Sequence, residues 1–206
     1  MLTTLRRQAA TGLRLLIVFT VLCGIAYPLA VWGVSRIPGL AGHAEGSVIT
    51  QNGTAVGSTL IGVDPVPADP AADPYFHTRP SASSDGVLGP ADTSTSGGSN
   101  KAGDSTVLLD TVSQRRALIA QREGVAPDAV PTDAVTASAS GLDPDISPQY
   151  AALQVGRVAR VTGLPVGEVE RLVAQATEGR ILGFLGEPTV NVTELNLAVA
   201  AAPTRG

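Results

Sequence analysis

The sequence predicts an α+β protein with a single N-terminal transmembrane helix, followed by one extracytoplasmic domain with a small antiparallel sheet and about four helices. Three observations support this prediction: an uncharged apolar run, an Asn-Gly turn between short β-type stretches, and capped apolar periodicities further on. We divide the chain into a cytoplasmic tail (1–12), a transmembrane helix (13–35) and an extracytoplasmic domain (36–206).

The apolar run spans residues 15–34 and carries no charge. At about 1.5 Å per residue these residues reach roughly 30 Å, which matches the hydrocarbon thickness of a bilayer. Arg6, Arg7 and Arg14 precede the run and only Arg36 follows it closely. An excess of basic residues marks the cytoplasmic side, so we expect the N-terminus inside. The alternative is a signal peptide cleaved near residues 42–44, but the run exceeds the usual apolar region of such peptides.

Small residues recur along the predicted membrane helix. At helical spacing they lie on one face, where a neighbouring helix can approach closely. Pro28 lacks a backbone donor, so we expect a kink in the helix near Gly24. A plain lipid-facing anchor is the alternative. The predicted helix–helix contact residues are Cys23, Ala26, Pro28, Ala30 and Gly33.

Composition limits the classes of function. The formal net charge is −4 and there is one lysine, so no basic patch predicts nucleic-acid binding. The one cysteine lies in the anchor, and the chain has only two histidines. We therefore expect neither an internal disulfide nor a metal site in the outer domain.

The first structured part of the outer domain is predicted to be a hairpin. Residues 47–50 and 55–63 flank an Asn52-Gly53 pair, which favours a tight turn. A Pro/Asp/Ala loop follows at 64–74 and should be irregular. Its three aspartates, Asp64, Asp69 and Asp73, could bind a cation, but Asp-Pro turns in solvent are the favoured interpretation.

Four helical segments are predicted after the loops. The first, 104–123, has Leu108, Val112 and Ile119 on its inner face. Its arginines, Arg115, Arg116 and Arg122, are placed outside that face or between its residues.

The other helices carry capping signals. Ser147 should cap a helix that begins with Pro148 and continues to about residue 161, with Ala152, Val155 and Ala159 inward. A helix at about 165–175 follows. Asn191, with Glu194 three residues on, predicts a last helix to about residue 201.

Catalytic and anion-binding patterns are weak. Residues 96–100, Ser-Gly-Gly-Ser-Asn, can form a backbone anion nest, although no phosphate-loop motif follows. Ser138, Ser140 and His77 could suggest a hydrolase, but no spacing joins them. Asp143 and Asp145 fit turn and helix-start roles better than paired acids.

Several short motifs occur together in a specific order. They include Tyr75-Phe76 with 79–82, 96–100, 135–143, Gln154 with 157–159, 186–188 and 190–198. In this order and spacing the chain resembles the C subunit of the bacterial Kdp potassium-transporting ATPase over nearly its whole length. It departs from the usual pattern at Val63-Asp64-Pro65, and its 64–74 loop is longer.

The resemblance implies an accessory, non-catalytic subunit of an ATP-driven potassium uptake complex in the bacterial cell membrane. The implied partners are a channel-like potassium-translocating subunit, a P-type ATPase subunit and a small hydrophobic subunit. The family is described as needed for assembly and as a catalytic chaperone that raises the affinity of the ATPase subunit for ATP. No cofactor is expected to bind tightly, and ATP is expected only as part of the complex.

The resemblance also implies site residues. Residues 154–160 look like the end of the signature helix of ABC-transporter ATPases, which makes Gln154 and Arg157 nucleotide candidates. The predicted topology places them outside, away from ATP, and an inter-helix hydrogen-bonding role for Gln154 is the favoured alternative. The candidates for subunit contact are Tyr75, Phe76, Arg79, Pro80, Ser81, Gly97, Gly98, Ser99, Asn100, Ser138, Ser140, Asp143, Glu187, Asn191 and Asn196.

Two other classes of function stay open at this point. One is a membrane-anchored extracytoplasmic binding module unrelated to transport, and the other is an anchored hydrolase. A role that suits an outside position is a brace over the external mouth of the channel-like subunit.

Overall fold

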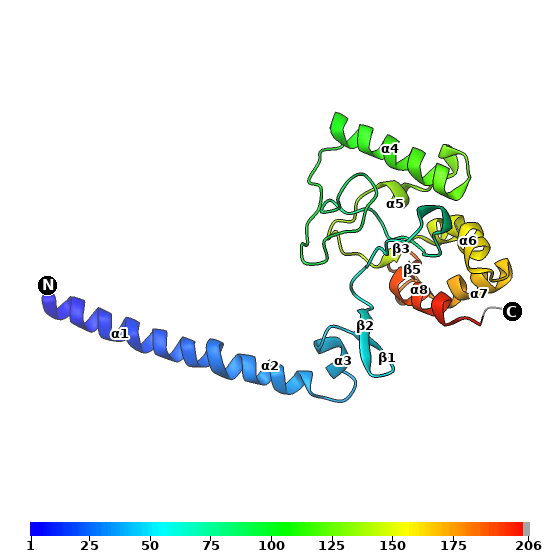
Figure 1. The fold of residues 1–206 in the computed structure, drawn as a ribbon. Helices are drawn as coiled ribbons and strands as arrows, with labels where there is room; N and C mark the ends of the chain where they lie inside the picture. Colours follow the sequence, from blue (N-terminus) through cyan, green and yellow to red (C-terminus); the bar gives the residue numbers. More distant parts are fainter. Residues whose placement is uncertain (204–206) are drawn as a thin grey trace. The chain divides into compact units, whose positions relative to one another are not determined.

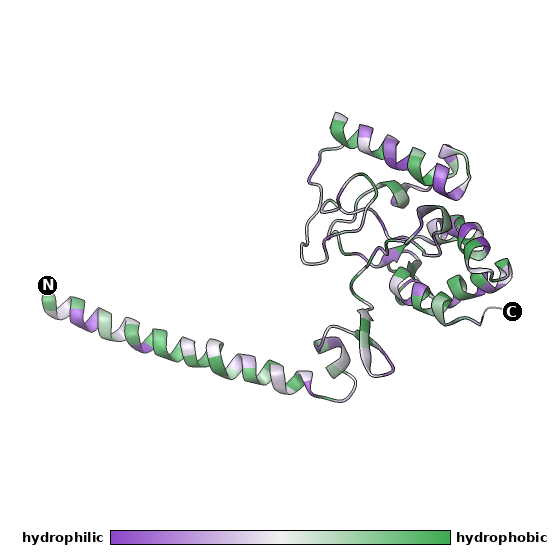
Figure 2. Ribbon diagram, in the orientation of Figure 1, coloured by the Kyte–Doolittle hydropathy of each residue, from purple (hydrophilic) through white to green (hydrophobic). Residues whose placement is uncertain are grey.

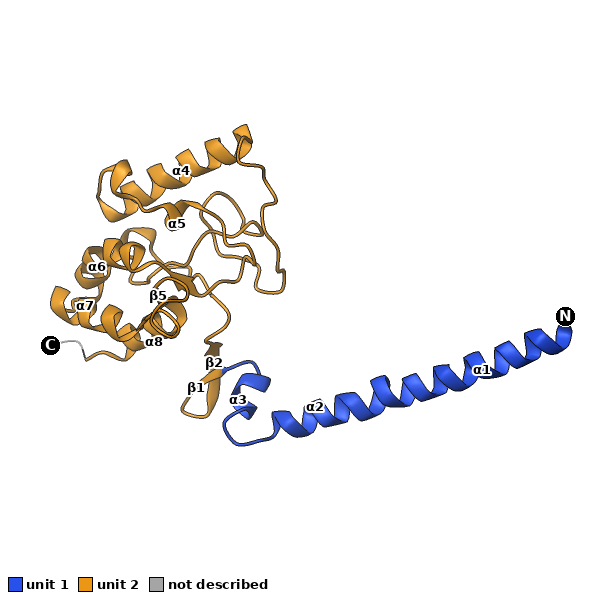
Figure 3. Cartoon of the chain, turned by 180° about the vertical axis from the view of Figure 1, so that it is seen from behind, with its two compact units in different colours: residues 1–47 blue, residues 48–206 orange. Residues whose placement is uncertain are grey.

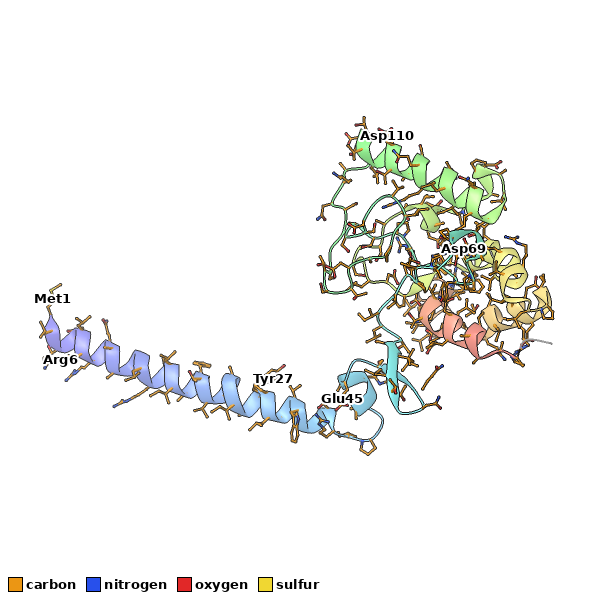
Figure 4. The ribbon with its side chains drawn as sticks, viewed as in Figure 1. Met1, Arg6, Tyr27, Glu45, Asp69 and Asp110 are labelled. Carbon is orange, nitrogen blue, oxygen red and sulfur yellow. The ribbon has the colours of Figure 1, made fainter. Side chains whose placement is uncertain are left out.

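The computed structural model describes residues 1–203, and the chain divides into two compact units, residues 1–47 and 48–206 (Figure 3). The first unit is dominated by a continuous helix of 34 residues, Leu2–Ser35, with an apolar surface along most of its length (Figure 2). Its side chains, including Arg6 and Tyr27, project outward (Figure 4). The helix is long and apolar enough to cross a membrane, as predicted, and it starts nearer the N-terminus than the apolar run does.

The long helix contains a π-helical turn at the place where the sequence predicts a kink. It consists of α1 (Leu2–Val21), the π-helical turn η1 (Leu22–Ala26) and α2 (Tyr27–Ser35). Pro28 has no N–H to donate to the carbonyl of Gly24, and a π turn accommodates that unpaired carbonyl without ending the helix. The same turn rotates Cys23 and Ala26 relative to Ala30 and Gly33, so the stripe of small residues is less straight than an ideal α-helix would make it.

The segment between the long helix and the first strand has structure of its own. A short helix, α3 (Ala41–Ala44), lies within it. The guanidinium of Arg36 forms an ion pair with Glu45 at 2.6 Å and lies 5.3 Å from the ring centroid of Trp32.

The predicted hairpin is present at the start of the second unit. Strands β1 (Val48–Gln51) and β2 (Thr54–Ser58) pair antiparallel around Asn52 and Gly53, which both have positive φ. The second strand ends five residues before the sequence predicts, because the hydroxyl of Ser58 accepts the Leu60 N–H and begins a turn. Gly62 then passes so close to the chain that an added Cβ would lie 2.5 Å from the Asp143 carbonyl oxygen.

The second sheet is small and antiparallel, in the strand order β3-β5-β4. Its strands are Asp145–Ile146 (β3), Thr177–Glu178 (β4) and Thr189–Asn191 (β5). Asp145 therefore lies in a strand and not at a helix start, which corrects its predicted role. The α+β class itself is confirmed.

Four long helices surround this sheet and the adjoining loops (Figure 1). Side-chain capping explains where three of them begin: Ser105, Ser147 and Asn191 each accept a backbone N–H from the residue three positions on. The long helices are α4 (Thr106–Glu123), α6 (Pro148–Thr162), α7 (Val166–Gln175) and α8 (Val192–Ala201), and the short ones are η2 (Pro70–Ala72), η3 (Pro127–Ala129) and α5 (Thr132–Val135).

The core lies where α6 packs against α7 and α4, with Ile119, Val158 and Leu195 fully buried. One prediction about a helix face is wrong. Ala152 is exposed, because Tyr150, Ala151 and Gln154 occupy the inner face of α6. Arg115 is buried on the inner face of α4, between residues that the apolar pattern placed inward.

Candidate functional site

Two side-chain amides hold an extended segment, residues 75–77, in the interior. Gln154 accepts the His77 N–H at 2.8 Å and donates to the His77 carbonyl at 3.3 Å. Asn196, from α8, does the same for Phe76, with both bonds at 2.8 Å. Each amide thus replaces a neighbouring strand, which satisfies backbone groups that would otherwise be buried and unpaired.

The imidazole of His77 lies between two carboxylates. Its Nδ1 is 2.7 Å from Asp64 and its Nε2 is 2.6 Å from Asp73. Because ionised carboxylates only accept hydrogen bonds, these two contacts together need a proton on each ring nitrogen or on one carboxylate. Burial would raise the pKa of Asp73, but the hydrogen bond and charge of His77, the Tyr75 amide and Arg157 together lower it.

Arg157 links this histidine to a second buried acid. Its guanidinium donates to both oxygens of Glu123 at 3.0–3.2 Å and to the carbonyl oxygens of Asp73 and Tyr75 at 2.8 and 2.9 Å. It also donates to Gln154. Arg122 donates to Glu123 and to the Tyr150 hydroxyl. We call these connected residues the buried polar network: Asp64, Asp73, His77, Arg122, Glu123, Tyr150, Gln154 and Arg157.

Three loops interleave beside this network. The Ser138 N–H donates to the Pro80 carbonyl and the Gly97 N–H donates to the Ser140 carbonyl, both at 2.8 Å. Gly141 has a φ of +73°, and an added Cβ would lie 2.7 Å from the Ser81 hydroxyl, so only glycine fits here. Arg79 contacts Asp143 at 3.3 Å, while its buried Nε has no partner among the described residues.

An apolar loop lies exposed between β4 and β5. Residues Ile181–Leu185 form a tight turn in which Leu182 is 80% and Phe184 is 68% exposed. Leu182 has a φ of +54°, which is costly for a branched side chain and holds it outward. Outside the long N-terminal helix, the loop places four large apolar side chains in solvent within five residues. We call it the apolar loop.

The structure brings most of the predicted contact residues together. Tyr75, Phe76 and Asn196 meet where the two side-chain amides hold residues 75–77. The interleaved loops bring together a second group: Arg79, Pro80, Ser81, Gly97, Ser138, Ser140 and Asp143. Gly98 lies in van der Waals reach of Ala139, and Ser99 and Asn100 follow it. Asn191 instead caps α8, and Glu187 lies apart in an exposed ion pair with Arg180.

The nucleotide candidates, Gln154 and Arg157, lie inside the buried polar network. Gln154 is 0% exposed and Arg157 is 4% exposed. Their polar atoms already bond to His77, Asp73, Tyr75 and Glu123. A nucleotide could reach them only after that segment moved, and nucleotide contact stays a prediction.

Sequence reasoning missed the acids of the network. Asp73 is buried and Asp64 is half-buried, so the expectation that they form turns in solvent is wrong for them, while Asp69 is exposed as predicted. The one local signal was the Asp73–His77 spacing of four residues. Glu123 and Tyr150 reach the network from two helices whose packing no local pattern predicts.

Catalytic readings find no geometric support. Both ring nitrogens of His77 are engaged by carboxylates, so neither is available to accept a proton from Ser138 or Ser140. Within residues 1–203, no group of three or more His, Cys, Asp or Glu side chains is arranged to hold a metal ion.

Comparison with known proteins assigns the family. The family model described as K+-transporting ATPase, c chain, matches residues 9–201. The chain belongs to this KdpC family. A potassium-transporting ATPase KdpC subunit from Kineococcus radiotolerans is 50% identical over 98% of this chain and 97% of its own length. Subunits of the same description from Geobacter sulfurreducens and Koribacter versatilis are 44% and 41% identical, each over 94% of this chain and 97% and 94% of their own lengths.

Membership of the KdpC family identifies the chain as an accessory membrane subunit of a potassium-transporting ATPase. It is not the catalytic subunit. The exposed surfaces of the second unit are therefore the places to look for subunit contacts.

Proposed function

We propose that this KdpC chain assembles a potassium uptake complex and acts on its P-type ATPase subunit as a catalytic chaperone that raises its affinity for ATP. In this proposal the long helix docks among partner helices through its small residues, with the N-terminus in the cytoplasm. Residues 48–203 lie outside and brace the external mouth of the channel-like subunit. The remaining partners are the P-type subunit and the small hydrophobic subunit.

The apolar loop carries the proposal. Keeping Leu182 and Phe184 in solvent does not stabilise the isolated chain, since burial of each side chain would contribute about 1.5–3 kcal/mol. Large exposed apolar groups on a folded protein mark contact surfaces. The channel-like subunit is the partner on the same side of the membrane in this topology, so we assign the loop to it.

The buried polar network supports an indirect effect on ATP affinity. Its groups are saturated by one another, and Gln154 is sealed from solvent. A body held in one conformation by such a network can favour one conformation of the complex, and with it one ATP affinity, without contacting the nucleotide. ATP then belongs to the complex and not to this chain.

The test is to purify the transport complex from cells that express the partner subunits with or without the full chain. We expect fewer assembled complexes without it, and a higher KM for ATP in those that form. A C-terminal reporter should be accessible only from outside. Unchanged assembly with an unchanged KM would contradict the function, and a reporter inside would contradict the brace.

A further inference from the structure

A second buried arginine has surroundings quite unlike those of Arg157. Arg115, on α4, is 6% exposed and donates from Nε to the Val87 carbonyl at 3.0 Å and from Nη1 to the Val135 carbonyl at 3.2 Å. Among the described residues no carboxylate forms an ion pair with it, and burial lowers its pKa with no acid to offset the effect. The positive charge is thus largely buried and uncompensated, which is costly.

One donor of Arg115 remains available. Its Nη2 bonds to no residue that the structure describes, and it is not sealed from solvent. Arg115 lines a hollow of about 380 Å³ between α4 and the 81–101 loops. That volume is within the range of about 300–1,000 Å³ that is usual for small-ligand sites.

The other residues that line the hollow include one basic residue, Lys101, and no acid. The hydroxyls of Ser84 and Thr111 also line it, but they already donate to the carbonyl oxygens of Ser81 and Val107. Lys101, the only lysine of the chain, is exposed and bonds to no described residue. The backbone N–H groups of Gly98, Ser99 and Lys101 also donate to no group in the described part of the chain. The hollow is therefore positive on a chain of net charge −4.

We propose that this hollow is a binding site for an oxyanion of the phosphate class, held by Arg115 Nη2, Lys101 and the Gly98–Lys101 amides. An arginine donor, a lysine and several free backbone amides that line one hollow form a donor set that suits phosphate oxygens. The anion is either a free phosphate or the headgroup of a lipid. This inference does not rest on the proposed role in transport, because it concerns binding by the isolated chain.

The experiment is calorimetric titration of the full chain, in a neutral detergent, with inorganic phosphate at constant ionic strength in a chloride background. We expect saturable binding that Lys101→Gln weakens by roughly fivefold or more, because a charged donor is lost. Arg160→Gln is the matched control: Arg160 is exposed on α6, does not line the hollow and has no partner among the described residues. Its phosphate affinity should equal that of the wild type.

Arg115→Lys tests the buried partner without removing its charge. We expect it to weaken phosphate binding, and unchanged thermal unfolding without phosphate would show that the loss is not misfolding. If Arg115→Lys does not fold, the Lys101→Gln comparison still decides. The absence of saturable phosphate binding, or equal losses in Lys101→Gln and Arg160→Gln, would overturn the site.

The source of the anion is resolved by placing the full chain in phosphatidylcholine nanodiscs with or without phosphatidylglycerol. If the site takes a free anion, phosphate affinity will be the same in both discs. If it takes a lipid headgroup, phosphatidylglycerol will compete and lower the apparent phosphate affinity in wild type but not in Lys101→Gln. Both results support an oxyanion site and differ only in its natural occupant.

Discussion

The buried polar network and the apolar loop reverse the usual distribution of side chains. Around His77, charged and amide groups lie inside, and each finds partners within the chain. At residues 181–185, large apolar groups lie outside and find none. The difference separates two tasks: the network fixes the conformation of the second unit, whereas the loop offers contact area to another protein. Substitutions in the two regions should therefore have different consequences.

The largest effect on stability is expected from Arg157→Met. Removing this guanidinium takes an ion-pair partner from Asp73 and from the fully buried Glu123 side chain. Breaking a buried pair from one side typically costs about 3–5 kcal/mol, and we expect that loss in the free energy of unfolding from denaturant titration. Arg160→Gln, on the same helix, should change it by less than about 0.5 kcal/mol. Similar values for the two variants would mean that the network does not hold the domain.

Asp73 makes the same network sensitive to acid. Its pKa is lower folded than unfolded, so its stabilising contribution is complete above the unfolded value, near 3.8, and disappears as the pH falls through the folded pKa. We expect the melting temperature to fall steeply below about pH 4 in the wild type. Asp73→Asn should be less stable at pH 7, and its melting temperature should fall less steeply as the pH is lowered below about 4. If the melting temperature of this variant fell as steeply in acid as that of the wild type, the acid sensitivity would belong to other carboxylates.

A smaller loss is expected from Gln154→Ala. It removes both hydrogen bonds between the Gln154 side chain and the His77 backbone, and it should lower the free energy of unfolding by about 1–3 kcal/mol. The same variant distinguishes the two interpretations of Gln154. If Gln154 contacts nucleotide, the KM of the complex for ATP will rise even when the variant is kept folded by a lower temperature or by stabilising additives. We expect KM to recover together with stability.

Local signals in the sequence predicted the parts of the fold that depend on neighbouring residues. The Asn52-Gly53 turn, the Ser147-Pro148 helix start and the Asn191 cap all occur where the residue types require them. The hydrogen bonds between Gln154 and His77 could not be predicted from local signals, because the two residues are 77 positions apart. The burial of Arg115 was not decided either, because the apolar pattern allows this arginine outside the inner face of α4 or between its residues.

The smallest expected effect concerns an acid outside the network. Burial and the nearby Asp143, Glu178 and Glu194 raise the pKa of Asp145. Its ionised form is therefore disfavoured in the folded state, and stability is lost as the pH rises through the folded pKa. Asp145→Asn should increase the free energy of unfolding at pH 7 by a few tenths of a kcal/mol, since the group is partly solvated. The gain should vanish below about pH 3.

The most direct test of the division of tasks is co-purification of the transport complex with a Leu182→Gln/Phe184→Gln chain. Leu109→Gln, at another exposed apolar position, on α4, is the control. We predict that the free energy of unfolding of the loop variant lies within about 0.5 kcal/mol of the wild-type value. The loop variant should nevertheless recover roughly tenfold less channel-like subunit, while the control recovers as much as the wild type. Full recovery with the loop variant would contradict the account.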